Sequence, residues 1–385
     1  MIKRYFDNAS VNRIYLHSAI LNAADRINLL FGPVFFLQHG FSVPETCLIL
    51  ASVYVLRFLA RMVYVTLFHR VGLKRGLIIG IVLWAASQLL LPFADHPAFL
   101  ILYLILFASG LAFYWTTYHT FFGFVGDDHH RGKQVSMLNG ISLCLMAAAP
   151  FFSAWFTTHF GFTGLFTLVA ALLLLSIWPI LKLQEAEEKL PPLRAIWRDP
   201  ANWWIVRLHL SESLQETGQS FLWPIAVFLM VGNLMLFGAI GTAGLLLLAL
   251  VQLVIGFFVD RGNGYGLFKI GCAIRLVQFI LRAFFVTTPA AIVASESLTA
   301  GRHIMLQSDA DYYNHGRRAK SGFWYFYFGE VAWDAGACLS FLAAAGFYAL
   351  GFGLPHLIGG LSLLGLIGMV SVILGPKPGH QDGKN

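Results

Sequence analysis

Charged side chains lie within long apolar stretches of this sequence. They comprise seven arginines and six acids: Arg26, Arg57, Arg61, Arg207, Arg275, Arg282 and Arg302, with Asp25, Glu212, Glu216, Glu296, Glu330 and Asp334. A charged side chain at the centre of a membrane-spanning helix costs about 2.5–3.5 kcal/mol on insertion scales, and it persists mainly beside a partner or a wet cavity. Static pairing with an opposite charge accounts for any one of these residues. The set as a whole favours a functional cavity inside a membrane.

The spacing of these charges is helical. Arg57 and Arg61, Glu212 and Glu216, and Glu330 and Asp334 are each four residues apart, which places both members of a pair on one helix face. Two neighbouring carboxylates in a low-dielectric site do not both ionise cheaply. We therefore expect one of Glu212 and Glu216 to hold a proton unless a cation lies beside both, as a proton carrier requires.

The composition predicts an all-α membrane protein. Apolar residues make up 58% of the chain, charged residues 12%, and the mean hydropathy is +0.70, values that exclude a water-soluble globular protein. The strands of a membrane β-barrel would alternate apolar and polar residues in segments of about ten, and the sequence does not favour that pattern. Apolar runs long enough to span a bilayer as helices lie near residues 14–37, 45–68, 76–94, 98–123, 137–157, 163–183, 203–230, 234–258, 267–287, 289–312, 323–348 and 353–374.

Lysine and arginine occur only in alternate loops between these twelve predicted helices. Because basic loops stay in the cytoplasm, this asymmetry predicts a multi-pass protein of the cell (inner) membrane with both termini cytoplasmic. The formal net charge of +7 is then explained by a basic surface beside anionic lipid in the bilayer. It requires no nucleic acid as a partner.

Similar loops recur about 190 residues apart. Phe68–Gly80 resembles Val259–Gly271, and Leu16-His17 resembles Leu208-His209. Such repeats indicate two pseudo-symmetric six-helix bundles. We expect an N-terminal bundle over residues 1–183, a charged and proline-containing cytoplasmic linker over 184–202, a C-terminal bundle over 203–375 and a disordered tail over 376–385.

The architecture and one loop motif resemble the major facilitator superfamily across essentially the whole chain. That family's signature between helices 2 and 3 is similar to Val65-Thr-Leu-Phe-His-Arg-Val-Gly-Leu-Lys-Arg75, which has His69 where the family has an acid. The second copy keeps Asp260 and Arg261. By this resemblance both loops latch the cytoplasmic gate, so His69 and Arg70 form one candidate gating pair. We expect Asp260 and Arg261 to do most of the latching, because an imidazole supplies no permanent negative charge.

The resemblance also implies that helices 1, 4, 7 and 10 line a central cavity. Together with the other mid-membrane charges, it gives these candidate substrate- or proton-binding residues: Asn22, Asp25, Arg26, Arg57, Tyr114, Tyr118, His119, Glu212, Glu216, Arg302, His303, Glu330 and Asp334. The aromatic residues on helix 4 suit a ring-bearing or hydroxylated solute. An ordinary aromatic-rich helix explains them equally well.

No catalytic, metal or nucleotide motif competes with transport. Asp127-Asp-His-His130 falls in a predicted solvated loop, and the four cysteines lie in different helices without a C-x-x-C pair. We therefore expect no enzyme activity, no cofactor and no metal. The leading hypothesis is a monomeric, proton-coupled secondary transporter that moves a small polar or anionic solute by alternating access. The alternatives are a non-transporting membrane sensor or assembly factor that retains the fold, and, more remotely, an intramembrane enzyme.

Overall fold

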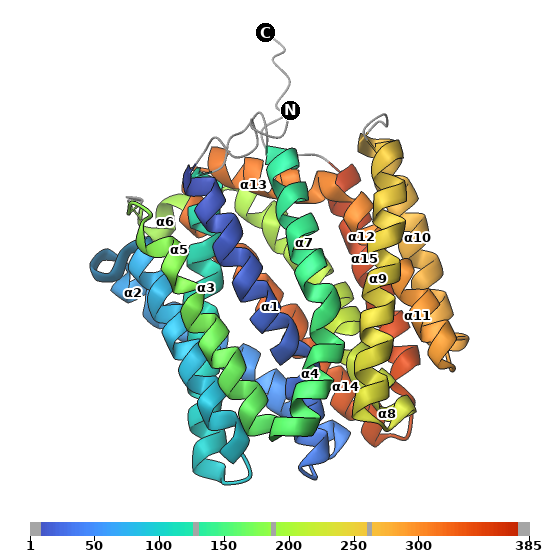
Figure 1. Ribbon diagram of the computed structural model, residues 1–385. Coiled ribbons are helices and arrows are strands. Elements are labelled where there is room, and N and C mark those ends of the chain that lie inside the picture. Colours follow the sequence, from blue (N-terminus) through green and yellow to red (C-terminus); the bar gives the residue numbers. More distant parts are fainter. Residues whose placement is uncertain (1–8, 126–130, 186–189, 260–263, 376–385) are drawn as a thin grey trace.

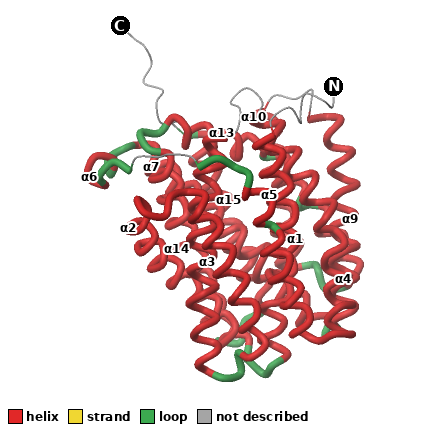
Figure 2. Tube along the Cα trace, turned by 60° about the vertical axis from the view of Figure 1, so that its left-hand side comes forward, coloured by secondary structure: helices red, strands yellow, loops and turns green. Residues whose placement is uncertain are grey.

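The computed structural model describes residues 9–125, 131–185, 190–259 and 264–375, and over these residues the chain is helical without a β-strand. Figure 2 shows helices side by side along one long direction, joined by short loops at the two ends. The first half contains α1 (Ala9–Gln38), α2 (Val43–Leu90), η2 (Leu91–Phe93), α3 (Pro97–Val125), α4 (Arg131–Leu175) and α5 (Ile177–Leu181).

The second half begins after the short helix α6 (Leu193–Ile196). It contains α7 (Pro200–Glu216), the π-helical segment η3 (Thr217–Leu222), α8 (Trp223–Val231), α9 (Leu234–Val259), α10 (Gly264–Phe284), α11 (Pro289–Ser297), α12 (Ala300–Ile304), α13 (Leu306–Arg318), α14 (Gly322–Ala349) and α15 (Leu354–Leu374). The segments α7, η3 and α8 follow one another directly and make a single interrupted crossing.

Two glycines divide the longest helices. Gly72 in α2 has φ 73° and Gly161 in α4 has φ 67°, in the left-handed region that favours glycine. The 48 residues of α2 and the 45 of α4 would otherwise extend well beyond one bilayer at about 1.5 Å per residue. Each therefore crosses twice, and the described helices make the twelve passes that the sequence predicts.

Seven helical stretches within the described residues are long and apolar enough to span a membrane by length and composition, including the 51-residue stretch Val43–Phe93 and the 35-residue stretch Ala147–Leu181. The crossings outside this set carry the charges or interruptions noted above: α7 to α8, α10, and α11 to α13. Helices α7, α8, α11, α12 and α13 are each shorter than 18 residues because these crossings are interrupted, and α10 carries Lys269, Arg275 and Arg282.

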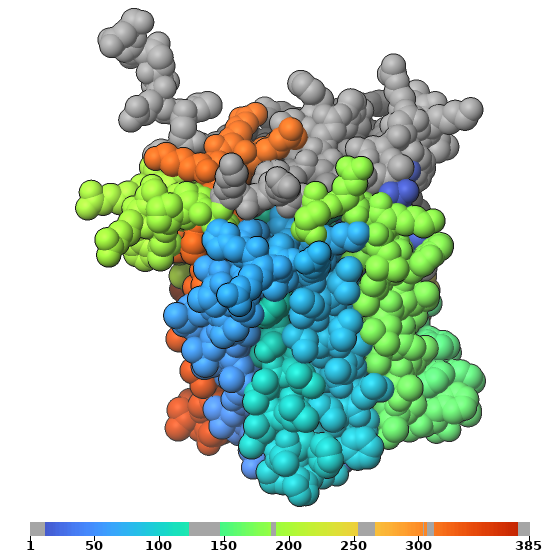
Figure 3. All heavy atoms as spheres, turned by 90° about the vertical axis from the view of Figure 1, so that its left-hand side faces the viewer, coloured from blue at the N-terminus to red at the C-terminus, as the bar shows by residue number. Residues whose placement is uncertain are grey.

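The two halves meet along two seams (Figure 1). α2 packs against α14, and α4 packs against α9. Figure 3 shows α2 and α3 in the middle of one face, with second-half residues along one side. In the α4–α9 seam a Cβ added at Gly238 would lie 2.5 Å from Cβ of Ala154 and 2.6 Å from the carbonyl oxygen of Pro150. Only glycine allows this approach, as at small-residue contacts between membrane helices.

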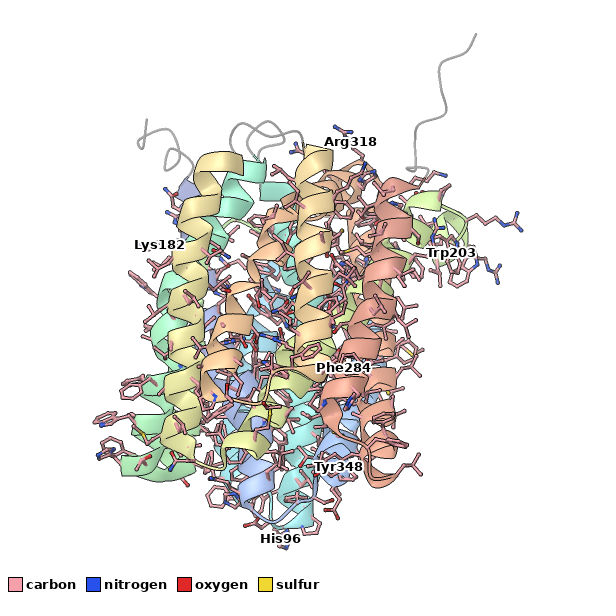
Figure 4. All side chains as sticks on the ribbon, turned by 90° about the vertical axis from the view of Figure 1, so that its right-hand side faces the viewer. His96, Lys182, Trp203, Phe284, Arg318 and Tyr348 are labelled. Atoms are coloured by element: carbon pink, nitrogen blue, oxygen red, sulfur yellow. The ribbon has the colours of Figure 1, made fainter. Side chains whose placement is uncertain are left out.

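Basic residues mark one end of the molecule. In Figure 4, Lys182 and Arg318 lie at one end of the helices, whereas His96 and Tyr348 lie at the other. We call the first the basic end and the second the opposite end. Lys74 lies near Lys182 because its Nζ donates to the carbonyl oxygens of Leu181 and Leu183, at 2.7 Å each.

Candidate functional site

A cavity of about 640 Å³ lies between the two halves, a size typical of small-molecule sites. Residues of α1 to α4 line it from the first half, and residues of α7, η3 and α8 to α15 line it from the second. Nine of the predicted site residues line it: Asn22, Asp25, Arg26, Arg57, His119, Glu212, Glu216, Arg302 and Glu330. The cavity thus gathers charges that lie as far apart in the chain as Asp25 and Glu330.

Four predicted site residues are placed differently. Tyr114 and Tyr118 are buried between α3 and α1, where their hydroxyls lie 3.0 Å from Nε2 of His17 and 2.9 Å from Oγ of Ser18. They are not among the residues that line the cavity. Asp334 is buried just behind its wall, and the side chain of His303 lies outside the described part of the structure.

Four buried charges join α2 to α14 across the seam. Nε and Nη2 of Arg61 lie 2.8 Å from Oδ2 of Asp334 and 2.7 Å from Oε2 of Glu330. Arg57 lies 3.2 Å from Asp334 and 3.3 Å from Glu330. Because each pair is four residues apart on its helix, both arginines face both acids. We call these four residues the charge cluster.

The charge cluster is almost completely buried, and its members pair with one another. Its side chains are at most 6% exposed. Nη1 of Arg61 also donates to Oγ1 of Thr116 at 2.5 Å, and the guanidinium of Arg57 lies 5.0 Å from the ring centre of Tyr54. In so apolar a setting, removing one charge leaves its partners uncompensated, which costs far more than the net stabilisation of the intact group.

Aromatic rings connect the halves between the charge cluster and the basic end. His119 bridges two parts of the second half, with Nε2 lying 3.4 Å from Oε1 of Glu330 and Nδ1 lying 3.0 Å from the hydroxyl of Tyr313. The rings of Phe68 and Phe323 are 4.5 Å apart. These contacts close the two halves against each other on that side of the cavity.

A second group of polar residues lies on the second-half wall. Nη2 of Arg282 pairs with Oε1 of Glu296 at 2.7 Å, and Nη1 donates to Oε1 of Gln219 at 2.5 Å. The ring of Trp223 lies beneath the Arg282 guanidinium at 4.6 Å, and its Nε1 donates to the same Glu296 oxygen at 3.1 Å. Arg302 lies 3.7 Å from Glu212.

Two acids on the cavity wall make no ion pair with a described residue. Asp25 has neither an ion pair nor a hydrogen bond there, although the charges of Arg26 and Arg57 act on it. Glu216 accepts a hydrogen bond from Oγ of Ser220 within its own helix. These carboxyl groups are consequently the ones whose charge is least compensated by direct contact.

The predicted gating residues lie near the basic end or beyond the described residues. His69 and Arg70 are exposed on α2 just before Gly72. Asp260 and Arg261 lie outside the described residues, so their gating role stays a prediction. An acid that the motif did not indicate is present beside the turn: Oε1 of Glu185 accepts from the backbone N–H of Lys74 at 2.8 Å.

Removing this cap is expected to weaken the turn between the two halves of α2. Glu185→Ala leaves the N–H of Lys74 without its acceptor, and the loss of a helix cap costs about 1 kcal/mol. His69→Ala is the matched control, because the His69 side chain is exposed. Thermal unfolding in detergent should show a lower midpoint for Glu185→Ala than for His69→Ala. Equal midpoints would mean that the cap contributes nothing.

A family model described as Major Facilitator Superfamily matches residues 16–301. The chain belongs to the major facilitator superfamily. The predicted fold class, twelve transmembrane helices in two pseudo-symmetric six-helix bundles, is confirmed for this superfamily member. No curated protein matches its sequence significantly.

Solved structures share the fold at low sequence identity. A crystal structure of the superfamily transporter FucP in the outward conformation has a TM-score of 0.67 at 12% identity, covering 95% of this chain and 98% of that one. A crystal structure of the E. coli fucose:proton symporter FucP has a TM-score of 0.64 at 13% identity, and the match covers 95% of this chain and 98% of that one. A structure from work on substrate recognition in proton-dependent oligopeptide transporters has a TM-score of 0.66 at 11% identity, and the match covers 95% of this chain and 97% of that one.

Several cavity residues of this superfamily member were not among the predicted site residues. Arg275, Arg282 and Glu296 were visible as charges in apolar stretches, but the resemblance directs attention to helices 1, 4, 7 and 10. Trp223 and Gln219 carried no signal, because only the fold brings them to Arg282.

Proposed function

We propose that this membrane transport protein is a proton-coupled secondary transporter that moves a small polar or anionic solute by alternating access. One observation carries the proposal: Asp25 and Glu216, two carboxyl groups without an ion pair to a described residue, line a cavity between the two halves. An acid that alternates between protonated and charged forms needs this placement, since a permanently paired carboxylate has little reason to take up a proton.

The seams between the halves support alternating access. We propose that residues 1–183 and 203–375 move as two bundles joined by the linker 184–202. On one seam the halves are held by the charge cluster and on the other by the close contact at Gly238. Alternating access requires that the contacts at one end of the cavity open while those at the other end stay closed.

The geometry narrows the choice among the predicted proton carriers. Glu212 lies 3.7 Å from Arg302, a permanent cation that compensates its carboxylate and supports a structural role. Glu330 and Asp334 belong to the charge cluster. Asp25 and Glu216 are therefore the carriers that we propose.

We also propose that the protein lies in the cell (inner) membrane as a monomer, with the basic end in the cytoplasm. The support is the position of lysine and arginine residues at one end of the molecule, because loops that carry these residues stay on the cytoplasmic side of the membrane. Impermeant thiol reagents applied to intact cells should label a cysteine at Asp95 and spare one at Lys182. The reverse pattern would overturn the orientation.

Reconstitution into liposomes tests the function directly. With a pH gradient imposed, solutes from panels of sugars, organic acids and amino acids are added outside, and the internal pH is followed with a trapped dye. Transport predicts that at least one solute makes protons enter with it, and that protein-free liposomes show no such flux. Solute accumulation that is indifferent to the pH gradient would remove the proton coupling, and the absence of flux for every solute would remove the proposal.

A further inference from the structure

Arg275 is a buried arginine with unused hydrogen-bonding capacity. It lies on α10, lines the cavity and is 1% exposed. Its Nη1 donates to Oε1 of Gln278 at 2.8 Å, and the amide of Gln278 is held in turn by the carbonyl oxygen of Ser295 and Oγ1 of Thr299. Nε and Nη2 of Arg275 meet no acceptor in the described structure. Burying guanidinium N–H groups in this state is costly.

These two atoms form the edge of the guanidinium that binds carboxylates side-on. Arg61 shows the pairing within the same molecule, with its Nε and Nη2 lying 2.8 Å and 3.4 Å from the two oxygens of Asp334. Such parallel hydrogen bonds to a carboxylate or phosphate are among the strongest that arginine makes. The Nε–Nη2 edge of Arg275 therefore has the geometry of an oxyanion receptor.

A second buried arginine on the same helix has hydrogen-bond and ion-pair partners. Arg282, seven residues further along α10, is 2% exposed and binds Glu296, Gln219 and Ser295. Arg275 packs 4.7 Å from the ring centre of Phe279, but among the described residues its only hydrogen-bond partner is Gln278. A purely structural role would explain Arg282, but it does not explain the unused edge of Arg275.

A second arginine faces the cavity from the other half. Arg26 on α1 lines the cavity, and its buried Nε has no acceptor among the described residues. Arg26 and Arg275 line this cavity from opposite halves, together with the acids Glu216 and Glu296. A ligand between them would contact both bundles.

The charges around these arginines connect anion binding to proton binding. Glu296 is paired with Arg282, which leaves Asp25 and Glu216 to offset Arg26 and Arg275. Asp25, Glu216, Arg26 and Arg275 all line the one cavity. An oxyanion that binds the arginines adds negative charge beside both acids, which favours their protonated forms.

We propose that Arg275 and Arg26 form an oxyanion-binding subsite, so that the solute is an organic acid bound together with protons on Asp25 and Glu216. This inference rests on the proposed function and specifies its substrate class. The rest of the cavity wall includes Phe221, Trp223, Phe237 and Leu245, which suit a ring or hydrocarbon body.

Binding of matched acids and amides to the purified full-length protein tests the subsite. The probes are benzoate and phenylacetate, their neutral isosteres benzamide and phenylacetamide, and phenyl phosphate, each followed by titration calorimetry and thermal stabilisation. We expect at least one acid to bind, its amide to bind at least about tenfold more weakly, and acid binding to strengthen from neutral to mildly acidic pH. Comparison of the carboxylates with phenyl phosphate identifies which oxyanion the subsite prefers.

Two variants locate the binding. Arg275→Gln is expected to weaken acid binding by about tenfold or more, because a hydrogen-bonded charge is lost. Arg207→Gln removes an exposed arginine of α7 and should bind as the wild type does. If Arg275→Gln fails to fold, the acid–amide and pH comparisons on the wild type still decide.

The proposal is overturned if amides bind as tightly as acids, if no probe binds, or if folded Arg275→Gln binds acids as tightly as the wild type. Its failure is distinguishable from that of the proposed function. Proton-coupled flux of a neutral sugar would remove the oxyanion subsite and leave transport standing. Arg275-dependent acid binding without proton-coupled flux would support the oxyanion subsite and remove the proposed proton-coupled transport.

Discussion

Asparagine in place of Asp25 is expected to reduce pH-driven solute accumulation to the level of protein-free liposomes. Asp25 lines the cavity without an ion pair or hydrogen bond to a described residue, so its carboxyl group is available to load and release a proton. Asparagine has the same shape but no titratable group. Exchange of labelled for unlabelled solute without a pH gradient should persist, because exchange does not require net proton movement.

The matched control is Asp95→Asn, which makes the same substitution at an exposed position at the opposite end. It should accumulate solute as the wild type does. Glu216→Gln, singly and combined with Asp25→Asn, shows whether Glu216 also carries protons during transport. Undiminished pH-driven uptake in the double variant would show that these carboxyl groups are structural and that coupling lies elsewhere.

Arg61→Gln is expected to produce the largest loss of stability, about 3–5 kcal/mol, because it leaves Glu330 and Asp334 buried with less compensation. Arg61 is completely buried and binds both acids across the α2–α14 seam. The two halves should also separate more readily there. Thermal unfolding reports the first effect, and the distance between spin labels on α2 and α14 reports the second.

The double variant Arg61→Gln/Asp334→Asn should recover part of the lost stability, since it removes an acid together with its partner. Arg75→Gln, an exposed arginine on the same helix, is the control and should be nearly neutral. A single variant as stable as Arg75→Gln, with an unchanged distance distribution, would show that the charge cluster does not hold the seam.

Apolar run length was sufficient to predict the twelve crossings, but not how they are joined or interrupted. The sequence suggested a loop between residues 68 and 76, whereas α2 continues on both sides of Gly72. A single glycine with positive φ reverses the chain, and hydropathy does not detect such a turn. The crossing expected at 289–312 is divided among α11, α12 and α13, which extends to Arg318.

The sequence predicted which site residues share a helix face, but not which residues pair with one another across helices. Four-residue spacing placed Arg57 with Arg61 and Glu330 with Asp334, because that regularity is local to each helix. Their pairing joins residues 273 apart and depends on how α2 packs against α14. For the same reason the sequence does not separate Arg275, with its unused edge, from Arg282, whose partners come from η3 and α11.

The π-helical segment η3 has a consequence for recognising relatives of this protein. A π-turn holds its hydrogen bonds one residue further along the chain than an α-turn does, so it accommodates an extra residue within a helix. Here the segment lies between Glu216 and Trp223, both on the cavity wall. A homologue that lacks one residue between positions 217 and 222 would form an uninterrupted α-helix and turn one of these side chains away from the solute. A one-residue gap in an alignment at this point would therefore mark a change of specificity, even where every charged residue is retained.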